Sequence, residues 1–144
     1  MRLTAIGPRE ASIFTALADA FVTPEPLLPA VRDTDAVGTF DTWLARSPPL
    51  NRIGLRVLLH LAELAPILSG GGRRLRRLDP ERARRWLSRA EHLPLRVPRE
   101  LVRALKTLIL LCYYGDPAVM ARLGYDAQAN MRRGRELRRA EGRP

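Results

Sequence analysis

Apolar residues recur along this chain at helical spacing, and prolines and glycines separate the apolar segments. The first segment is typical, because Gly7-Pro8 supplies a helix start and apolar residues follow three or four positions apart. These residues are Phe14, Leu17, Ala18 and Phe21. Such signals predict helices over about residues 8–21, 33–46, 49–68, 79–92, 98–114 and 116–124. No segment alternates like a strand, so the pattern predicts an all-α fold, a compact bundle of about six helices.

Three of the predicted helices carry an apolar face that we expect to be buried. The face of the second consists of Val37, Phe40, Trp43 and Leu44. That of the third, which is the longest, consists of Ile53, Val57, Leu61, Leu64 and Leu68. That of the fifth consists of Leu105, Leu108, Ile109 and Cys112. Charged residues interrupt the third and fifth predicted helices, so neither contains the ~20 consecutive apolar residues of a membrane span. Both are expected to be buried helices of a soluble protein.

The last part of the chain is polar and basic. After residue 126, Met131 and Leu137 are the only large apolar side chains. Because so few apolar groups cannot stabilise packing against a core, we expect a helical domain over residues 1–126. A basic tail, residues 127–144, should follow it as a disordered segment or a frayed helix.

Composition excludes several classes of protein. A hydrophobic content of 46% over 144 residues excludes a wholly disordered polymer, and the single cysteine, Cys112, excludes an intrachain disulfide. The two histidines, His60 and His92, cannot form an ordinary structural zinc site with that one thiol. The N-terminal residues show no export signal and no twin arginine. A cytoplasmic location is therefore expected, with export alongside a partner left open.

The net charge of +10 is confined to one half of the chain. Residues 1–72 carry 6 basic and 7 acidic side chains, whereas residues 73–144 carry 19 and 8, and all the basic residues except Lys106 are arginine. The densest cluster comprises Arg73, Arg74, Arg76, Arg77, Arg82, Arg84, Arg85 and Arg89. Interleaved acids favour a solvated helix face there, and an acidic protein surface, nucleic acid or an anionic membrane are the alternative ligands.

No residue pattern indicates a catalytic, cofactor-binding or metal-binding site. The Gly70–Gly72 run lacks the preceding strand and the spacing of a phosphate-binding loop, and Cys112 lies in an apolar stripe that favours an inert thiol. His60 and His92 are expected to be salt-bridged or to face solvent. The scattered carboxylates are expected to form surface ion pairs. The chain is therefore not expected to be an enzyme by itself.

The tyrosines at the end of the helical region, Tyr113, Tyr114 and Tyr125, have two interpretations. Their rings can pack against the bundle with their hydroxyl groups hydrogen-bonded at its edge. They can also form an interface with a partner, because tyrosine and tryptophan are common in such contacts. Together with Trp86 they are the candidate partner-interface residues.

Three blocks of residues together resemble the small-subunit family called gluconate 2-dehydrogenase subunit 3. They are Glu10–Phe21 with the proline-rich connector after it, Leu78–Leu87, and Leu105–Leu111 leading into Tyr113-Tyr114-Gly115-Asp116-Pro117 and Leu123-Gly124-Tyr125-Asp126. The third block is the most specific. In it, Asp116 is expected to cap a helix, Pro117 to take the first helical position, and Gly124 to end the helix in the left-handed conformation.

The resemblance implies a helical, noncatalytic subunit without a flavin or haem of its own. Such subunits bind a large FAD-dependent dehydrogenase or oxidase of the glucose–methanol–choline class and help it mature, and they often carry a twin-arginine signal that this N-terminus lacks. The favoured hypothesis is an accessory or maturation subunit, with FAD held by the partner. The alternative is a small basic nucleic-acid-binding protein that uses the region Arg73–Arg89, and an adaptor for anionic membranes is a third hypothesis.

Overall fold

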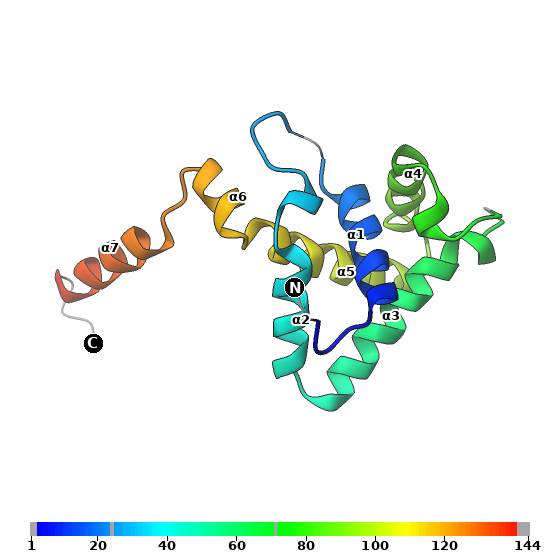
Figure 1. Cartoon of the computed structure of the whole chain (residues 1–144), viewed down its shortest axis with the longest axis horizontal. Helices are drawn as coiled ribbons and strands as arrows, with labels where there is room; N and C mark the ends of the chain where they lie inside the picture. The colour runs from blue at the N-terminus through cyan, green and yellow to red at the C-terminus, as the bar shows by residue number, and fades with distance from the viewer. Residues whose placement is uncertain (1–2, 24, 71, 141–144) are drawn as a thin grey trace.

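Helices form the whole of the regular structure in the part of the chain that the computed structural model describes, residues 3–23, 25–70 and 72–140. Seven α-helices and no strands are present in these residues (Figure 1). They are α1 (Pro8–Phe21), α2 (Ala36–Arg46), α3 (Pro49–Leu68), α4 (Pro80–Ala90), α5 (Arg96–Tyr114), α6 (Pro117–Arg122) and α7 (Ala127–Ala140). Two short 3-10 turns, Val31–Asp33 and Leu75–Arg77, precede α2 and α4. The predicted all-α fold is confirmed.

Helix α1 is the element around which the bundle packs. It contacts α2, α3, α4 and α5, and Figure 1 shows it in the middle of these helices. Its side chains Ile13, Phe14 and Leu17 are fully buried. The ring of Phe14 stacks on that of Phe40 in α2, with 4.8 Å between the ring centroids. Because burial of a side chain of this size contributes about 1.5–3 kcal/mol, α1 provides much of the apolar stabilisation of the fold.

Prolines mark most of the helix starts. A proline occupies the first turn of α1, α3, α4 and α6, where its missing N–H has no consequence because the first amides of a helix lack an intrahelical acceptor. Helix α2 begins at Ala36, three residues later than predicted, because Val31–Asp33 forms a separate 3-10 turn. Helix α5 begins at Arg96, two residues before Pro98, which therefore still lies in the first turn.

The predicted orientation of α3 is wrong, because its longest apolar stripe faces solvent. The exposed residues are Ile53, Val57, Leu61, Leu64 and Leu68. On the opposite side, Leu59, Glu63 and Pro66 are buried against the bundle. Helix α3 carries apolar residues on both sides, so periodicity alone could not show which side packs on α1. In the described part of the chain, no helix is long and apolar enough to cross a membrane.

The buried side of α2 also differs from the prediction. Phe40 and Leu44 are buried as expected, but Trp43 is 51% exposed. The position that completes the buried side is Asp41, which is four residues after Val37 and three before Leu44. Helical spacing therefore directs the Asp41 carboxylate inward, and Trp43 lies at the edge of the apolar face.

Residues 127–140 form helix α7, where the sequence predicts a disordered tail or a frayed helix. The two large apolar side chains of α7, Met131 and Leu137, are both exposed. Figure 1 shows α7 extending away from the bundle beyond α6. Residues 141–144 of the predicted tail lie outside the described residues, as do Pro24 of the connector and Gly71 of the glycine run. Helix α7 therefore adds basic surface to the molecule and no large side chain to its core.

Substitution of Gly124 by valine is expected to lower the free energy of unfolding by about 1–3 kcal/mol. Gly124 has a φ of +67°, which a β-branched residue adopts only under strain. A Cβ atom at this position would meet no other atom within 4 Å, so the expected cost is backbone strain alone. Thermal melting measures the change.

The matched control for this change is Gly54→Ala. Gly54 lies inside α3, has equally open space around an added Cβ atom, and lacks a positive φ. Alanine there should stabilise the helix by about 0.5–1 kcal/mol. Equal melting temperatures for the native protein and Gly124→Val would contradict the prediction.

Candidate partner-binding surface

Among the described residues, four carboxylates are buried, and for these four the expectation of surface ion pairs is wrong. They are Glu10, Asp41, Glu63 and Asp116, each 5% exposed or less. A buried carboxylate needs hydrogen bonds or a charged partner. The sequence did not show these roles, because most of the partners are backbone amides or arginines far along the chain. These four carboxylates hold together the helices and turns that carry the candidate binding surfaces.

Asp41 attaches the N-terminal segment to α2. Its Oδ2 accepts hydrogen bonds from the backbone N–H and the hydroxyl of Thr4, both at 2.9 Å. Its Oδ1 accepts from the N–H groups of Ala5 at 2.8 Å and Ile6 at 2.9 Å. Burial by itself raises the pKa of Asp41, but these hydrogen bonds outweigh burial and hold its pKa below the ordinary value. The fold therefore contains Asp41 in its charged form.

Acidification is expected to destabilise the protein below about pH 4, and Asp41→Asn should remove part of that dependence. The pKa of Asp41 is lower in the folded state, so its stabilising contribution is complete above the unfolded pKa of about 3.9. That contribution is lost as the pH falls through the folded pKa. Urea unfolding across this pH range measures it, with the exposed Asp33→Asn as the control. Identical pH profiles for Asp41→Asn and the native protein would contradict the prediction.

Glu10 connects the start of α1 to α3. Its Oε1 accepts a hydrogen bond from Arg56 Nε at 2.6 Å and lies 3.5 Å from His60 Nε2, while its Oε2 accepts from the Gly7 N–H at 2.7 Å. Burial raises the pKa of Glu10, but the hydrogen bonds from Arg56 and Gly7 outweigh it and lower that pKa overall. His60 thus lies in a salt-bridging position, one of the two expected for it.

Glu63 connects α3 to the turn before α4. Its side chain is fully buried, and its Oε1 accepts a hydrogen bond from Arg76 Nε at 2.8 Å. Its Oε2 accepts from the Arg76 backbone N–H at 3.2 Å. One carboxylate therefore satisfies both a charge and a backbone amide, and it fixes the turn Leu75–Arg77 against α3.

Asp116 connects α6 to the start of α2. Its Oδ1 accepts hydrogen bonds from the N–H groups of Ala118 at 2.8 Å and Val119 at 3.4 Å, and its Oδ2 accepts from the Asp35 N–H at 2.8 Å. Asp116 and Pro117 occupy the cap and the first helical position that the sequence predicts. The contact with Asp35, 81 residues away, had no signal in the sequence.

The structure separates the three tyrosines. Tyr113 is 1% exposed, and its hydroxyl donates a hydrogen bond to the Pro29 carbonyl oxygen at 2.7 Å. Its ring packs in the core, so burial removes Tyr113 from the candidate interface residues. Burial, with a smaller effect of Tyr114, raises the pKa of Tyr113. Tyr114 and Tyr125 are 42% and 54% exposed and stay available to a partner.

A row of exposed aliphatic side chains runs along the solvent side of α3. We call it the α3 outer face, and it consists of Leu50, Ile53, Val57, Leu61, Leu64 and Leu68. These residues lie three or four positions apart, so they follow one side of the helix from its second residue to its last. Single exposed apolar residues are ordinary, whereas a contiguous apolar patch marks an interaction surface. The α3 outer face is therefore the principal candidate for partner binding.

Trp86 lies half-buried in a groove between α4 and the C-terminal end of α3. Its Nε1–H donates a hydrogen bond to Ser69 Oγ at 2.9 Å. The groove has a volume of ≈ 330 Å³ and is lined by Pro66, Leu78, Arg82, Arg85, Trp86 and Arg89. Trp86 therefore packs against the core and also borders an open groove, which fits both interpretations of this residue.

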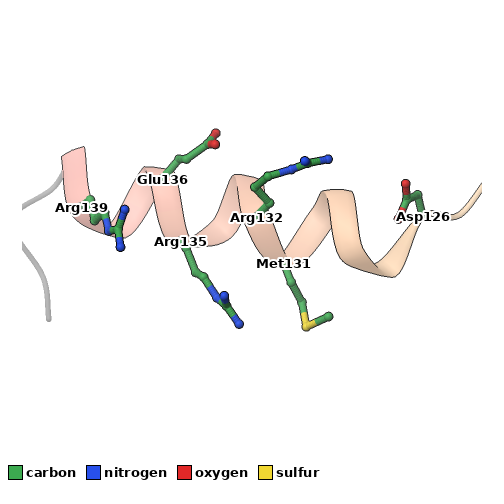
Figure 2. A pocket seen from close by; sticks show the side chains of 6 residues that line it. All are labelled: Asp126, Met131, Arg132, Arg135, Glu136 and Arg139. Atoms are coloured by element: carbon green, nitrogen blue, oxygen red, sulfur yellow. The ribbon is translucent and has the colours of Figure 1, made fainter.

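A larger hollow, of ≈ 530 Å³, lies along α7 and does not form an enclosed site. It is lined by Asp126, Met131, Arg132, Arg135, Glu136 and Arg139. Figure 2 shows these side chains projecting in different directions from one helix and the residue before it. Ligand pockets are concave and mostly apolar, with a few polar groups that converge on the ligand. This hollow is therefore weaker as a candidate than the α3 outer face and the groove beside Trp86.

Within the described residues, the cysteine, the two histidines and the glycine run do not form one site. Burial raises the pKa of the Cys112 thiol to about 11, so this group is protonated at neutral pH. The Nδ1 atom of His92, in the turn after α4, lies 2.8 Å from the carbonyl oxygen of Ser88. Gly70 and Gly72 have positive φ values in the connection after α3. Among the described residues, no group of three or more histidine, cysteine or acidic side chains could hold a metal ion.

Comparison of the chain with family models, with curated proteins and with solved structures finds no match. A functional proposal therefore rests on the surfaces of the molecule and on its residue pattern. Three exposed features of the described residues are the candidates for binding a partner: the α3 outer face, the groove beside Trp86, and the side chains of Tyr114 and Tyr125.

Proposed function

We propose that this chain is a noncatalytic accessory subunit that docks on a large FAD-dependent dehydrogenase or oxidase of the glucose–methanol–choline class. The observation that carries the proposal is the α3 outer face, six large aliphatic side chains on one side of a 20-residue helix. The FAD would belong to the large subunit. This chain would contribute binding surface and assist maturation, and it would carry out no chemistry of its own.

An apolar face of this kind favours a protein partner over a polyanion. Burial of an aliphatic side chain contributes about 1.5–3 kcal/mol, so even the half-exposed side chains of this face represent a substantial gain on docking. Permanent interfaces between subunits are rich in such residues. Phosphate groups gain nothing from them, because nucleic-acid binding depends on charge and on base stacking.

The choice of a flavoprotein comes from the resemblance alone, and the three resembling blocks lie in helices that contact one another. The first block forms most of α1, the second leads into and forms most of α4, and the third covers the C-terminal half of α5 and the residues on either side of α6. Helix α1 contacts both α4 and α5, α4 contacts α5, and α5 contacts α6. The blocks therefore form one packed unit, which is expected if they define a common structural family.

Purification of the affinity-tagged full chain from its native cells tests the proposal. The expected result is a large polypeptide in fixed stoichiometry, with bound FAD seen in the absorbance spectrum and a complex that survives moderate salt. The chain purified alone should show helical circular dichroism and no flavin absorbance. Recovery of nucleic acid in place of a flavoprotein, with affinity that falls steeply with salt, would overturn the proposal in favour of the basic-protein alternative.

A further inference from the structure

The groove beside Trp86 is distinct from the α3 outer face and has a different chemistry. Its floor is apolar, formed by Pro66, Leu78 and the Trp86 ring, and its rim carries three arginines. Pro66 is on the buried side of α3, opposite the outer face. The groove is therefore a second surface, on the other side of the same helix.

The floor of the groove is held in place by contacts already present in the chain. The hydrogen bond from Trp86 Nε1–H to Ser69 Oγ fixes the indole against the end of α3. The buried Glu63 binds Arg76 through two hydrogen bonds, and the turn Leu75–Arg77 leads directly into Leu78. A floor fixed in this way needs little ordering when a ligand binds, which lowers the entropic cost of association.

The three arginines on the rim, Arg82, Arg85 and Arg89, lie on one side of α4. Their spacing of three and four residues spans about 10 Å along the helix. Among the residues that the structure describes, no carboxylate lies within 4.0 Å of any of them. By contrast, the neighbouring Arg84 pairs with Glu81 at 2.7 Å on a different side of the helix. The rim therefore presents three positive charges without an ion-pair partner among the described residues.

We propose that this groove binds an acidic segment of a partner protein that carries one large apolar side chain. The apolar side chain would occupy the floor against Pro66 and Trp86, and two or three carboxylates would pair with the arginine rim. Arginine forms two parallel hydrogen bonds with a carboxylate, so the rim suits this group geometrically as well as in charge. The inference does not depend on the identity of a large subunit.

A helical segment matches the groove best. Carboxylates at positions i, i+3 or i+4, and i+7 of a helix are spaced over about 10 Å, as the arginines are. A volume of ≈ 330 Å³ is at the lower limit of small-molecule pockets, so it suits one side chain better than a cofactor. A single-stranded nucleic acid can also stack a base on the Trp86 ring, so an oligonucleotide is a necessary competitor in the test.

Fluorescence anisotropy with synthetic peptides and the full chain tests the proposal. The first probe is a labelled helical peptide of about 12 residues, some 18 Å long, with three glutamates at this spacing and one central leucine. The matched probes replace the glutamates by glutamine or the leucine by serine. We expect each replacement to weaken binding by roughly tenfold or more. Equal binding of the glutamate and glutamine peptides would overturn the proposal.

Charge reversal on the protein provides the second arm. The triple variant Arg82→Glu, Arg85→Glu, Arg89→Glu should lose peptide binding, whereas the same triple change at Arg132, Arg135 and Arg139 of α7 should leave it intact. Trp86→Phe keeps an aromatic ring in the floor and should bind more strongly than Trp86→Ala. Should the reversed variant lose its helical circular dichroism, glutamine in place of the three arginines gives the same comparison.

Two outcomes distinguish other ligands. Equal loss of peptide binding in the α4 and α7 variants would show attraction by net charge alone and would overturn the proposal. Tighter binding of a single-stranded oligonucleotide than of the acidic peptide, with a steep salt dependence, would also overturn it. Failure to recover a flavoprotein from cells would leave the peptide result unchanged, so the two proposals can fail separately.

Discussion

Substitution of Glu63 by alanine is expected to lower the free energy of unfolding by about 3–5 kcal/mol. The change leaves the Arg76 guanidinium, which is only 27% exposed, and the Arg76 backbone N–H without their acceptor. It also removes a fully buried side chain and so leaves a cavity between α3 and the turn Leu75–Arg77. Because the turn Leu75–Arg77 is held by this carboxylate, we expect Leu75 to lose its packing as well. Urea unfolding followed by circular dichroism measures the effect.

The matched control is Glu81→Ala on the surface of α4. Glu81 pairs with Arg84 at 2.7 Å, as short a contact as that of Glu63, but its side chain is 66% exposed. Exposed pairs of this kind contribute about 0.2–1 kcal/mol, so the control should change stability little. Replacement of both Glu63 and Arg76 by methionine should recover part of the loss, because no charge is then left buried without a partner. Equal effects of Glu63→Ala and Glu81→Ala would contradict the assigned role.

Local sequence signals predicted the helices well because those signals act locally. A proline in the first turn, an acidic cap and a glycine in the left-handed conformation each depend on a few neighbouring residues. The bounds of α1 and the arrangement of Asp116, Pro117 and Gly124 at α6 therefore follow from the printed sequence. The hydrogen bond that the Asp35 N–H donates to Asp116, just before α2, joins residues 81 positions apart. No window of local sequence contains that information.

The side on which a helix packs was harder to predict where apolar residues lie on more than one side. In α5 the predicted stripe is buried at Leu105, Ile109 and Cys112, and Leu111 in the same apolar run is 67% exposed. Helix α3 instead offers two apolar sides, and the longer stripe is the one that faces solvent. A stripe predicted for the core thus became the candidate interface. The same ambiguity is expected of any helix that packs on its own bundle and on a partner.

The candidate site was only partly visible in the sequence for a related reason. Tyr113 and Tyr114 are adjacent and look equivalent, but adjacent helical residues point about 100° apart, so one is buried and the other exposed. The arginines on the rim of the groove were visible as a charged cluster. Their division into paired and unpaired members depends on where Glu63 and Glu81 lie in three dimensions. Charge can be counted from a sequence, whereas pairing cannot.

The double variant Val57→Glu, Leu61→Glu is expected to abolish docking of the large subunit while the chain stays folded. Both side chains are 50% exposed at the middle of the α3 outer face, so the charges stay solvated in the isolated chain. In a complex they would be buried against an apolar partner surface. Loss of two central contacts of this kind costs at least about 2 kcal/mol, or roughly thirtyfold in affinity, before the desolvation of the charges is counted. Co-purification and thermal melting measure the two effects separately.

Two controls define what this result means. Leu59→Glu, on the buried side of the same helix, should unfold the chain, because it places a charge in the core. Met131→Glu on α7, where the native side chain is 56% exposed, should affect neither melting nor docking.

The isolated native chain should also bind an apolar dye or self-associate weakly through the α3 outer face, and the double variant should do neither. A double variant that still recovers the flavoprotein in full would place the docking surface elsewhere. A stable, stoichiometric dimer of the native chain that the double variant abolishes would instead assign this face to a second copy of the chain.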